Sequence, residues 1–391
     1  MTYYVGLDIA KFKHDCFIMD HNGEVIHESF SFKNDNKGFG ELLDVLNTLD
    51  RSSKIKIGLE ATGHYAVNLK IFLEENDFSY MEFHPLFIRR FSAATNLRRT
   101  KTDKVDAQLI ALYLSTVDYK PYPNKSYHIY SLKLLTRNRD KLVKERSLQL
   151  VRMTNMLDLI FPEFKPFFKD RISSATALYL LENYGLPSKI ARMNVDSYNK
   201  MKSKLKRTIS YAGFLELKQL ARDTVGNQDP LLVFQLESYL ELFKELDSKI
   251  TLFDRHIGSE FDQIHTHISS IPGIGLISAA SIFAEIGNIA RFSNADKLLA
   301  FAGLEPSTIQ SGEAEHNGKM VKHGSSHLRF VLMNAAQYSL IHNPVLYEYY
   351  LKKRNEGKAH RVALSHVAKK IVRIIYHLET HDIDFDLSES R

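Results

Sequence analysis

The chain contains a single cysteine, Cys16, among 391 residues. One cysteine excludes an internal disulfide framework and a cysteine-rich zinc site, and it favours a reducing, cytoplasmic compartment. No apolar run is long enough to cross a bilayer, and the first residues lack the basic flank and apolar stretch of a signal peptide, so no membrane partner is expected. No P-loop pattern is present, which argues against an ATP-driven machine.

The composition that remains is typical of a globular protein. Hydrophobic residues make up 44% of the chain and charged residues 25%. A length of 391 residues predicts two or three domains, each with a sizeable core. The formal net charge of +6 is compatible with a nucleic-acid partner but does not establish one.

The first 120 residues predict a mixed β-sheet with helices. Runs of β-branched and aromatic residues predict strands, and the Asn22-Gly23 pair between two apolar runs predicts a hairpin. The resulting order is three strands, helix, strand, helix, strand, helix, which matches the ribonuclease H–like plan. The expected strands are 3–9, 16–19, 25–30, 55–60 and 78–83, and the expected helices are 39–49, 65–75 and one that begins near Asp103.

Four carboxylates fall where such a sheet would bring them together. Asp8 on the first strand and Glu60 at the end of the fourth can lie side by side, and Asp103 and Asp106 can reach them from the last helix. Because like charges raise each other's pKa, the cluster would need a hard divalent cation, Mg²⁺ or Mn²⁺, to stay ionised. Each acid alone is more simply interpreted as a turn or surface residue. The prediction of a metal site depends on all four acids occurring together in this arrangement.

Three cations, Arg98, Arg99 and Lys101, directly precede this helix. They would favour an anionic ligand such as a phosphodiester. The alternative is an ordinary capped helix with Thr102 as N-cap and a solvated charge cluster beside it.

The middle of the chain predicts long helices. Prolines in 121–131 suggest a linker, and apolar spacing over 132–161 suggests one long amphipathic helix, followed by a small helical region over about 172–226. The basic run 202–207 is interpreted as a solvated face. From Leu231 onward two apolar seams repeat every seven residues, which predicts a coiled coil that pairs within the chain or between protomers and favours oligomerisation. The seams are Leu236, Phe243, Ile250, Ile257 and Ile264, and Tyr239, Leu246 and Phe253.

His265 and His267 have the spacing of metal ligands. No third candidate ligand stands near them in the sequence, so they are interpreted as the end of a helix.

The last part of the chain carries a glycine motif and a polar glycine-rich loop. Gly273 and Gly275 precede a helix of small residues, which suits either a helix-hairpin-helix turn that takes a phosphate or simple tight packing. After Gly303 the helical pattern stops, and a polar loop is expected. In it Ser311 is either a nucleophile or an ordinary loop serine. Lys319, Lys322 and Arg329 surround it, and a basic amphipathic helix over 362–378 suits a nucleic-acid backbone.

Together these motifs resemble the DEDD transposases of the insertion sequence one-ten family, the bridge-RNA-guided serine recombinases. The resemblance covers nearly the whole chain, and it is the order and spacing of the motifs that make it specific. The matching runs are 5–11, 59–63, 101–107, 271–275, 301–306, 310–312 and 357–364.

The resemblance implies a RuvC-like (RNase H-like) domain over residues 1–120, in which Asp8, Glu60, Asp103 and Asp106 bind Mg²⁺. It implies a helical coiled-coil region over 121–266 and a mainly helical transposase domain over 267–391. Ser311 of that last domain would attack a DNA phosphate and form a covalent phosphoserine intermediate, which conserves bond energy until the strands are rejoined.

The family also implies partners. The active site would be composite across protomers of a dimer or tetramer that the coiled coil holds together. An RNA encoded by the element would pair with target and donor DNA. Two alternatives remain open: a metal-dependent nuclease of the Holliday-junction-resolvase type, in which water attacks and Ser311 is incidental, and a non-catalytic nucleic-acid scaffold.

Overall fold

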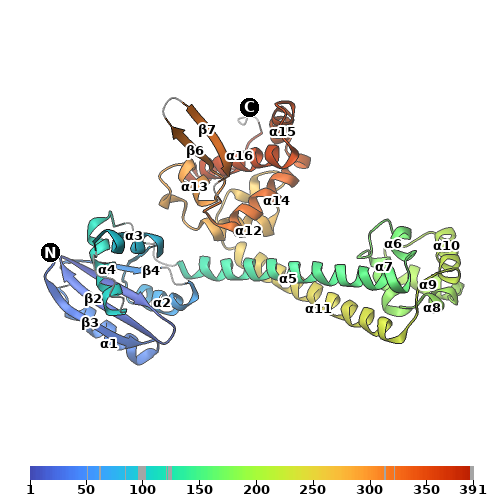
Figure 1. Ribbon diagram of the computed structural model, residues 1–391, viewed down its shortest axis with the longest axis horizontal. Helices are drawn as coiled ribbons and strands as arrows, with labels where there is room; N and C mark the ends of the chain where they lie inside the picture. Colours follow the sequence, from blue (N-terminus) through green and yellow to red (C-terminus); the bar gives the residue numbers. More distant parts are fainter. Residues whose placement is uncertain are drawn as a thin grey trace. The chain divides into compact units, whose positions relative to one another are not determined.

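The computed structural model describes residues 1–50, 52–60, 63–83, 85–95, 103–119, 121, 126–311, 314–320 and 322–387. The chain divides into two units, Met1–Ser131 with Gly287–Ser293, and Leu132–Ile286 with Asn294–Arg391. The first unit is α/β, and helices dominate the second (Figure 1). The expected combination of an α/β part with a helical part is therefore confirmed.

A five-stranded mixed sheet forms the centre of the first unit, in the order β3-β2-β1-β4-β5. β1 (Thr2–Ile9), β2 (Lys13–Asp20) and β3 (Val25–Lys33) are antiparallel neighbours. β4 (Lys54–Glu60) runs parallel to β1, and β5 (Tyr80–Phe83) runs parallel to β4. The predicted strands and the hairpin at Asn22-Gly23 are confirmed, and Gly23 supplies the positive φ of 85° that the turn requires.

One face of this sheet packs on α1 (Asn36–Thr48) and α2 (Val67–Glu75), which follows the short 3₁₀ turn η1 (Gly63–Ala66). Every second residue of the two central strands enters this core, as a half-buried pleat requires. Asp35 caps α1 by accepting a hydrogen bond from the Gly38 amide at 2.8 Å. The core side chains include Val5, Leu7, Ile57, Leu59, Leu42, Leu46, Leu69 and Leu73.

The opposite face packs on α4 (Asp103–Thr116), which begins where the sequence predicts. α4 lies so close to β1 that a Cβ on Gly6 would come 2.1 Å from the Ala107 carbonyl oxygen and 2.6 Å from the Ala111 nitrogen. Only glycine permits this backbone approach. α3 (Pro85–Thr95), which directly follows β5, was not predicted from the sequence.

Replacing Gly6 with alanine should therefore destabilise the first unit by about 2 kcal/mol or more, because the new methyl group meets backbone atoms that cannot turn away. The free energy of unfolding from urea titration measures the effect. Gly40→Ala is the matched control, since Gly40 lies in α1 with no atom within 4 Å of its Cβ position. That substitution should be neutral or slightly stabilising. An equal, small effect of the two changes would contradict the packing argument.

Two long helices follow: α5 (Ser126–Ile160), whose residues from Leu132 onward belong to the second unit, and α11 (Pro230–Phe261), which lies wholly within it. They run antiparallel: Arg139 pairs with Asp254 at 2.8 Å, and Arg146, further along α5, pairs with Asp247, further back on α11. α5 begins at Ser126, so the linker expected over 121–131 is wrong for its last residues. Neither proline nor glycine occurs over 126–131, and nothing there interrupts the helix.

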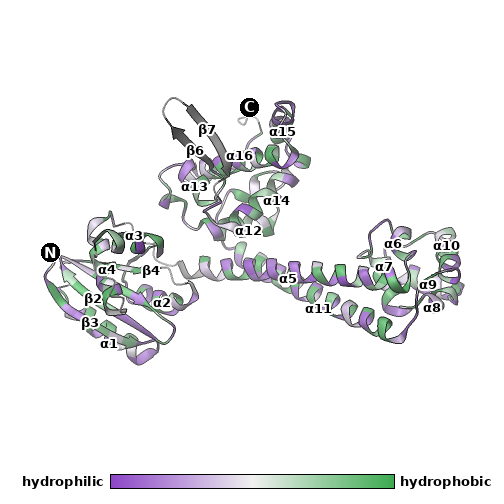
Figure 2. Cartoon of the chain, in the orientation of Figure 1, coloured by the Kyte–Doolittle hydropathy of each residue, from purple (hydrophilic) through white to green (hydrophobic). Residues whose placement is uncertain are grey.

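Figure 2 shows hydrophilic and hydrophobic residues alternating along both long helices. Leu236, Phe243, Ile250 and Ile257 of the first heptad seam are buried, whereas Ile264 lies beyond the end of α11. Leu236 and Phe243 share a core with Met153 and Leu157 of α5. This part of the heptad seam therefore packs against α5 of the same chain.

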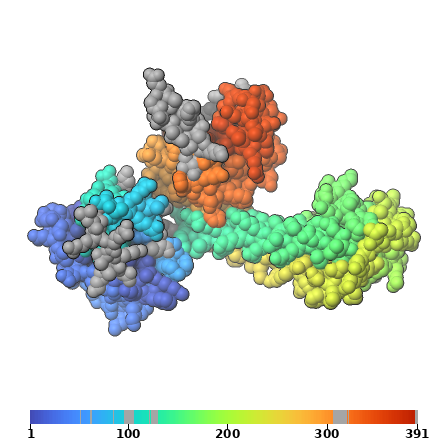
Figure 3. Space-filling model, viewed as in Figure 1, coloured from blue at the N-terminus to red at the C-terminus, as the bar shows by residue number. Residues whose placement is uncertain are grey.

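A helical lobe follows α5 and precedes α11, as expected for the region of about 172–226 (Figure 3). Its helices pack on the end of α5 and the start of α11 around Phe161, Phe164 and Phe214. The four lysine and arginine side chains of 202–207 are exposed, which confirms their interpretation as a solvated face. The helices are α6 (Phe164–Phe167), α7 (Ala175–Asn183), α8 (Pro187–Ala191), α9 (Val195–Lys204) and α10 (Tyr211–Arg222).

The C-terminal part of the second unit is helical around α16 (His360–His381), which contacts α13, α14 and α15. The predicted amphipathic pattern of 362–378 is confirmed by its buried stripe of Ala363, Val367, Ile371 and Ile375. Within the described ranges no helix is long and apolar enough to traverse a lipid bilayer. The other helices here are η2 (Ile268–Ser270), α12 (Leu276–Ile286), α13 (Ala295–Phe301), α14 (Ser326–His342) and α15 (Pro344–Asn355). The turn η3 (Ile289–Arg291) belongs to the first unit.

The polar loop expected after Gly303 is wrong in part, because most of it is a β-hairpin. β6 (Pro306–Ser311) pairs antiparallel with β7 (Ala314–Met320). The register joins Ser311 to Ala314, and positions 312 and 313 lie outside the described residues. In the sequence, Gly312-Glu313 is a Gly-X pair of the kind found in two-residue hairpins, a signal that the polar composition masked.

Candidate active site

Asp8 and Glu60 lie at the ends of two neighbouring parallel strands. The register pairs Leu7 with Leu59, and Asp8 and Glu60 are the next residues on each strand. Leu7 and Leu59 enter the core beneath α1 and α2. Because side chains alternate along a strand, Asp8 and Glu60 project on the opposite face, the one that α4 covers.

The direction of α4 carries Asp106 toward the same place. Ala107 lies against Gly6, whereas Leu114, further along the helix, belongs to a cluster with Tyr4. α4 therefore runs antiparallel to β1, and its first turn extends toward Asp8. Asp106 is half-buried in that turn. Asp103 begins the helix, and its side chain lies outside the described residues, as do Arg98, Arg99 and Lys101.

Asp15 is a further acid on this face that the sequence analysis missed. It stands directly opposite Asp8 in the pairing of β1 with β2, so the two side chains share a face of the sheet. Asp15 is 2% exposed, accepts a hydrogen bond from the Ser31 hydroxyl and lies 3.7 Å from the Lys13 ammonium. The available signal was its position directly before the apolar run Cys16–Met19 of β2.

Ser311 is the last residue of β6 and belongs to the second unit, whereas the four carboxylates belong to the first. The side chains of Ser311 and Lys319 lie outside the described residues, and their backbone is part of the hairpin. Lys322 follows β7, with an exposed side chain and a left-handed φ of 56°.

The base of this hairpin is held by two glycines in close contact. A Cβ on Gly324 would meet the Phe301 carbonyl oxygen at 2.1 Å and the Gly303 nitrogen at 2.4 Å. The Ser325 amide donates to the Phe301 carbonyl at 2.7 Å. Arg329 donates to the Ala302 carbonyl at 3.3 Å. This bond places the guanidinium at the hairpin base, where it also has a structural role.

A buried carboxylate, Glu285 of α12, lies beneath the hairpin base. Glu285 is 3% exposed and accepts two hydrogen bonds from the Arg137 guanidinium, at 2.5 and 3.0 Å. The Lys133 ammonium is 3.5 Å away, and the hydroxyl of Ser325, the residue that caps α14, donates to Glu285 at 2.9 Å. One acid thus joins α5, α12 and the start of α14.

Burial alone would raise the pKa of Glu285, but the hydrogen bond from Arg137 and the charges of Lys133 and Arg137 outweigh it. The net pKa lies below the ordinary value of 4.5. A carboxylate with a depressed folded pKa contributes stability that is complete above its unfolded value. That contribution is lost as the pH falls from about 4.5 through the lower folded value.

Arg137→Ala should cost about 3 kcal/mol in the free energy of unfolding at neutral pH, because it leaves Glu285 buried with its main partner removed. The loss should shrink in acid, where Glu285 is protonated. Denaturant titrations at pH 7 and near pH 4 measure both effects. Lys249→Ala removes an exposed pair with Glu245 and should change little. Equal effects of the two substitutions would refute a central role for Glu285.

The glycines before α12 differ from each other. Gly273 has a φ of 96°, and its Cβ position is 2.5 Å from the Ser339 Cα of α14, so packing requires glycine there. Gly275 has no atom within 4 Å of its Cβ position, and its carbonyl accepts from the Ala279 amide at 2.9 Å. The packing interpretation accounts for Gly273, and Gly275 leaves open space at the start of α12.

His265 and His267 do have a third candidate ligand, which corrects the sequence analysis. Asp382, 115 residues after His267, lies 2.9 Å from the His267 Nε2 and 3.1 Å from the His265 Nε2. A contact between positions so far apart in the chain has no local sequence signal.

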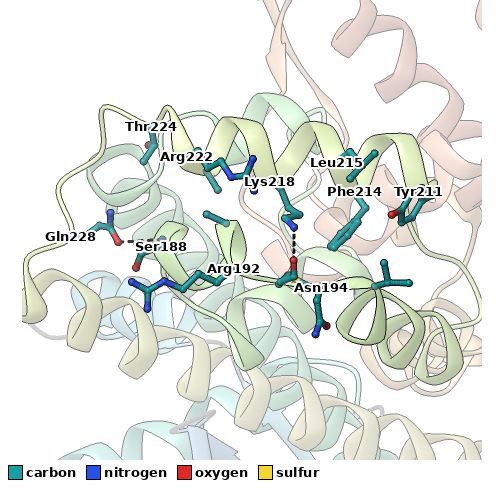
Figure 4. Close-up of a pocket in the computed structure, with 14 residues that line it drawn as sticks. Ser188, Arg192, Asn194, Tyr211, Phe214, Leu215, Lys218, Arg222, Thr224 and Gln228 are labelled. Atoms are coloured by element: carbon teal, nitrogen blue, oxygen red, sulfur yellow. Dashed lines mark hydrogen bonds between the residues drawn. The ribbon is translucent and has the colours of Figure 1, made fainter.

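A surface cavity of about 790 Å³ lies in the helical lobe, between α8 and α10 (Figure 4). Its lining combines the cations Arg192, Lys218 and Arg222 with the rings of Tyr211 and Phe214. Lys218 donates to the Met193 carbonyl. Basic and aromatic side chains together suit a nucleic-acid strand, so this cavity is a secondary candidate that the sequence did not reveal.

Two family models match the chain. One, described as Transposase and built on DEDD enzymes of IS110, matches residues 5–162. The other, described as Transposase IS116/IS110/IS902 family, matches residues 265–351. The first match spans Asp8, Glu60, Asp103 and Asp106, and the second spans the hairpin with Ser311.

Similar proteins come from insertion elements and from a DNA inversion system. The chain is 25% identical to the Insertion element IS116 uncharacterized 44.8 kDa protein of Streptomyces clavuligerus, over 95% of this chain and 93% of that one. It is 25% identical to the Insertion element IS900 uncharacterized 42 kDa protein of Mycobacterium paratuberculosis, over 95% and 94%. It is 23% identical to the Pilin gene-inverting protein of Moraxella bovis, over 98% and 97%.

The matches to both transposase models and to insertion-element proteins identify a transposase, an enzyme that cleaves and rejoins DNA. The chain belongs to the IS110 family of DEDD transposases. Enzymes of this kind generally use a divalent metal.

Proposed function

We propose that this transposase exchanges DNA strands through a covalent phosphoserine intermediate at Ser311, assisted by a divalent cation that Asp8, Glu60, Asp103 and Asp106 hold. The observation that carries the proposal is the antiparallel course of α4 across β1. It directs the first turn of α4, with Asp106, toward the strand ends that carry Asp8 and Glu60. This arrangement is the one expected of a RuvC-like domain over residues 1–120.

The donor chemistry fits Mg²⁺ or Mn²⁺. Carboxylate oxygens are the ligands that hard divalent cations prefer. Asp8, Glu60 and Asp106 are half-buried, so solvent screens their mutual repulsion only in part. When bound, such a cation would neutralise charge on a DNA phosphate and stabilise a leaving oxygen. The carboxylates would hold that cation at the strand ends, which is where the negatively charged scissile phosphate would bind.

The serine step transfers a phosphoryl group without loss of the phosphodiester energy. The Ser311 hydroxyl gives up its proton and bonds to the phosphorus, and the bond from phosphorus to one deoxyribose oxygen breaks. That oxygen leaves on the cut strand and takes up a proton. In the second step a deoxyribose oxygen of the exchanged strand attacks the phosphoserine and releases Ser311. Lys319, Lys322 and Arg329 would neutralise phosphate charge near the hairpin.

Sequence similarity supports DNA as the substrate. The Moraxella bovis relative is named for inverting the pilin gene, which is a reaction of cleavage and rejoining. An element-encoded guide RNA, pairing with target and donor DNA, is the partner expected of this family. Arg98, Arg99, Lys101, Gly273 and Gly275 are the further nucleic-acid contacts we propose, and Gly275 has the open surroundings that a backbone contact needs.

Oligomerisation through the 121–266 region would use the faces of α5 and α11 that remain uncovered. Part of the heptad seam of α11 is already buried within the chain. Exposed apolar side chains remain on both long helices, and a partner helix could cover them in a coiled coil. They include Leu148 and Val151 on α5, and Leu231, Phe234, Leu242 and Leu252 on α11. A dimer or tetramer would complete the active site between the domain over 1–120 of one protomer and the domain over 267–391 of another.

Ser311→Ala should abolish the covalent protein–DNA species. Protein, guide RNA and labelled DNA are incubated with Mg²⁺ and denatured in detergent, and the gel is read for label that stays on the protein. Ser307→Ala, on the same strand β6, is the matched control and should keep the adduct. DNA cleavage that survives Ser311→Ala would support the nuclease alternative. Absence of cleavage by the wild type with either metal would leave the scaffold alternative.

Asp106→Asn should lower strand exchange at least 100-fold while DNA binding stays measurable, because the substitution removes charge from the cation site but keeps the size of the side chain. Rates of strand exchange and a filter-binding assay measure the two properties. Asp118→Asn, an exposed position just after α4, is the control. Unchanged strand exchange in Asp106→Asn would overturn the assignment of the carboxylates.

A further inference from the structure

A second group of metal-ligand side chains lies in the other unit, where the loop after α11 meets the end of α16. The Nε2 atoms of His265 and His267 are 3.1 and 2.9 Å from the same atom, Asp382 Oδ1. One ligand atom from each of these three residues lies within 4.8 Å of the others. The Nδ1 of His267, on the other side of its ring, is 2.8 Å from Asp384 Oδ1.

The backbone around this group is held in place by separate hydrogen bonds. One oxygen of Glu379 accepts from the Thr266 hydroxyl at 2.7 Å and from the His267 amide at 2.8 Å. The Ser270 hydroxyl accepts from the Phe385 amide at 2.8 Å and donates to the His267 carbonyl at 2.6 Å. The segment after α16 is thus fixed to the histidine loop on both sides of the cluster.

Asp382 has a left-handed backbone, with φ 56° and ψ 48°, as the residue that ends α16. Non-glycine residues adopt this conformation uncommonly, and it turns the Asp382 carboxylate back toward the two imidazoles. His267 is 9% exposed, whereas the side chains of His265 and Asp382 are each 78% exposed. The cluster therefore has one buried member and an open side toward solvent.

Simple ion pairing explains the cluster poorly. Ion pairs between exposed histidine and aspartate side chains contribute little to the free energy of folding. Here, moreover, two imidazoles face the same carboxylate oxygen, so both rings share a single hydrogen-bond acceptor. The two carboxylates, Asp382 and Asp384, also bring negative charge that a divalent cation would balance. Imidazole nitrogen with carboxylate oxygen is the ligand set of zinc and its neighbours, in contrast to the all-carboxylate set of the first unit.

We propose that His265, His267 and Asp382 bind a transition-metal ion, with Zn²⁺ as the best fit, and that Asp384 orients the His267 ring through Nδ1. Tetrahedral zinc about 2.0 Å from each ligand atom needs ligand atoms roughly 3.3 Å apart. The histidine nitrogens stand 2.9 and 3.1 Å from the Asp382 oxygen, which needs shifts of a few tenths of an ångström, and all three ligand atoms lie within 4.8 Å of one another. Asp384 holds the hydrogen on Nδ1, which leaves Nε2 free to coordinate.

The ion would join the loop after α11 to the segment after α16, two parts of the chain that are far apart in the sequence. Three protein ligands leave a fourth position for water or for a ligand from outside the chain. This site is independent of the proposed phosphoserine chemistry, because none of its residues belongs to the carboxylate group or to the hairpin with Ser311.

The test is a titration of the chelator-stripped full-length protein with Zn²⁺, followed by calorimetry, in buffer containing excess Mg²⁺ to occupy the carboxylate site. We expect one Zn²⁺ per chain and a rise in Tm of several degrees at saturation. Co²⁺ in place of Zn²⁺ should give visible absorption bands of a tetrahedral site, a readout that does not depend on transposase activity.

Four variants separate this site from incidental binding. His265→Ala and Asp382→Asn change exposed side chains, so they should fold normally, lose the cobalt bands and weaken Zn²⁺ binding at least 100-fold. Asp384→Asn should weaken binding by 10- to 100-fold, as expected for an orienting carboxylate. His256→Ala, an exposed histidine of α11, should bind as the wild type does. Equal Zn²⁺ affinity in wild type, His265→Ala and Asp382→Asn, or no saturable binding by the wild type, would overturn the proposal.

Discussion

The contact between Gly6 of β1 and the backbone of α4 is the constraint on which the N-terminal unit depends. A Cβ at Gly6 would stand 2.1 Å from the Ala107 carbonyl oxygen, so the helix rests on the strand with no side chain between them. Gly58 on the neighbouring strand faces Ile110 and Leu114 of the same helix. Two glycines side by side in the sheet therefore determine how closely α4 approaches the sheet and in which direction it runs. That direction in turn determines where Asp106 lies.

Local patterns were enough to predict the sheet, the α4 start at Asp103 and the long helices, because burial on one face imposes a period of two or of 3.6 residues. The grouping of Asp8 with Glu60 was predictable as well, since both end parallel strands. What local patterns could not supply are contacts between distant positions, such as Glu285 with Arg137 or His267 with Asp382. The hairpin of β6 and β7 was missed because its composition is polar, and α3 was missed although Pro85, at its first position, is a typical helix start.

Buried polar residues orient the helices of the second unit in a way that its apolar cores do not. Apolar burial in the helical lobe would tolerate small shifts between α5 and its neighbours, since hydrophobic contact has no preferred direction. Glu285, in contrast, accepts hydrogen bonds from Arg137 and from the Ser325 hydroxyl, each with its own geometry. Ser325 follows Gly324 at the hairpin base. The Glu285 carboxylate therefore links the orientation of α5 and α12 to the position of the hairpin base.

The hairpin also limits how its own length can vary. Its base is fixed by the approach of Gly324 to Phe301, and Ser311 stands at the far end, opposite Ala314. Since successive residues of a strand face opposite sides, adding one residue to each strand would turn the serine to the other face, and adding two would restore it. If Ser311 acts as proposed, relatives with longer or shorter hairpins are therefore expected to differ from this chain by even numbers of residues in each strand, because the base is fixed and the serine must keep its face.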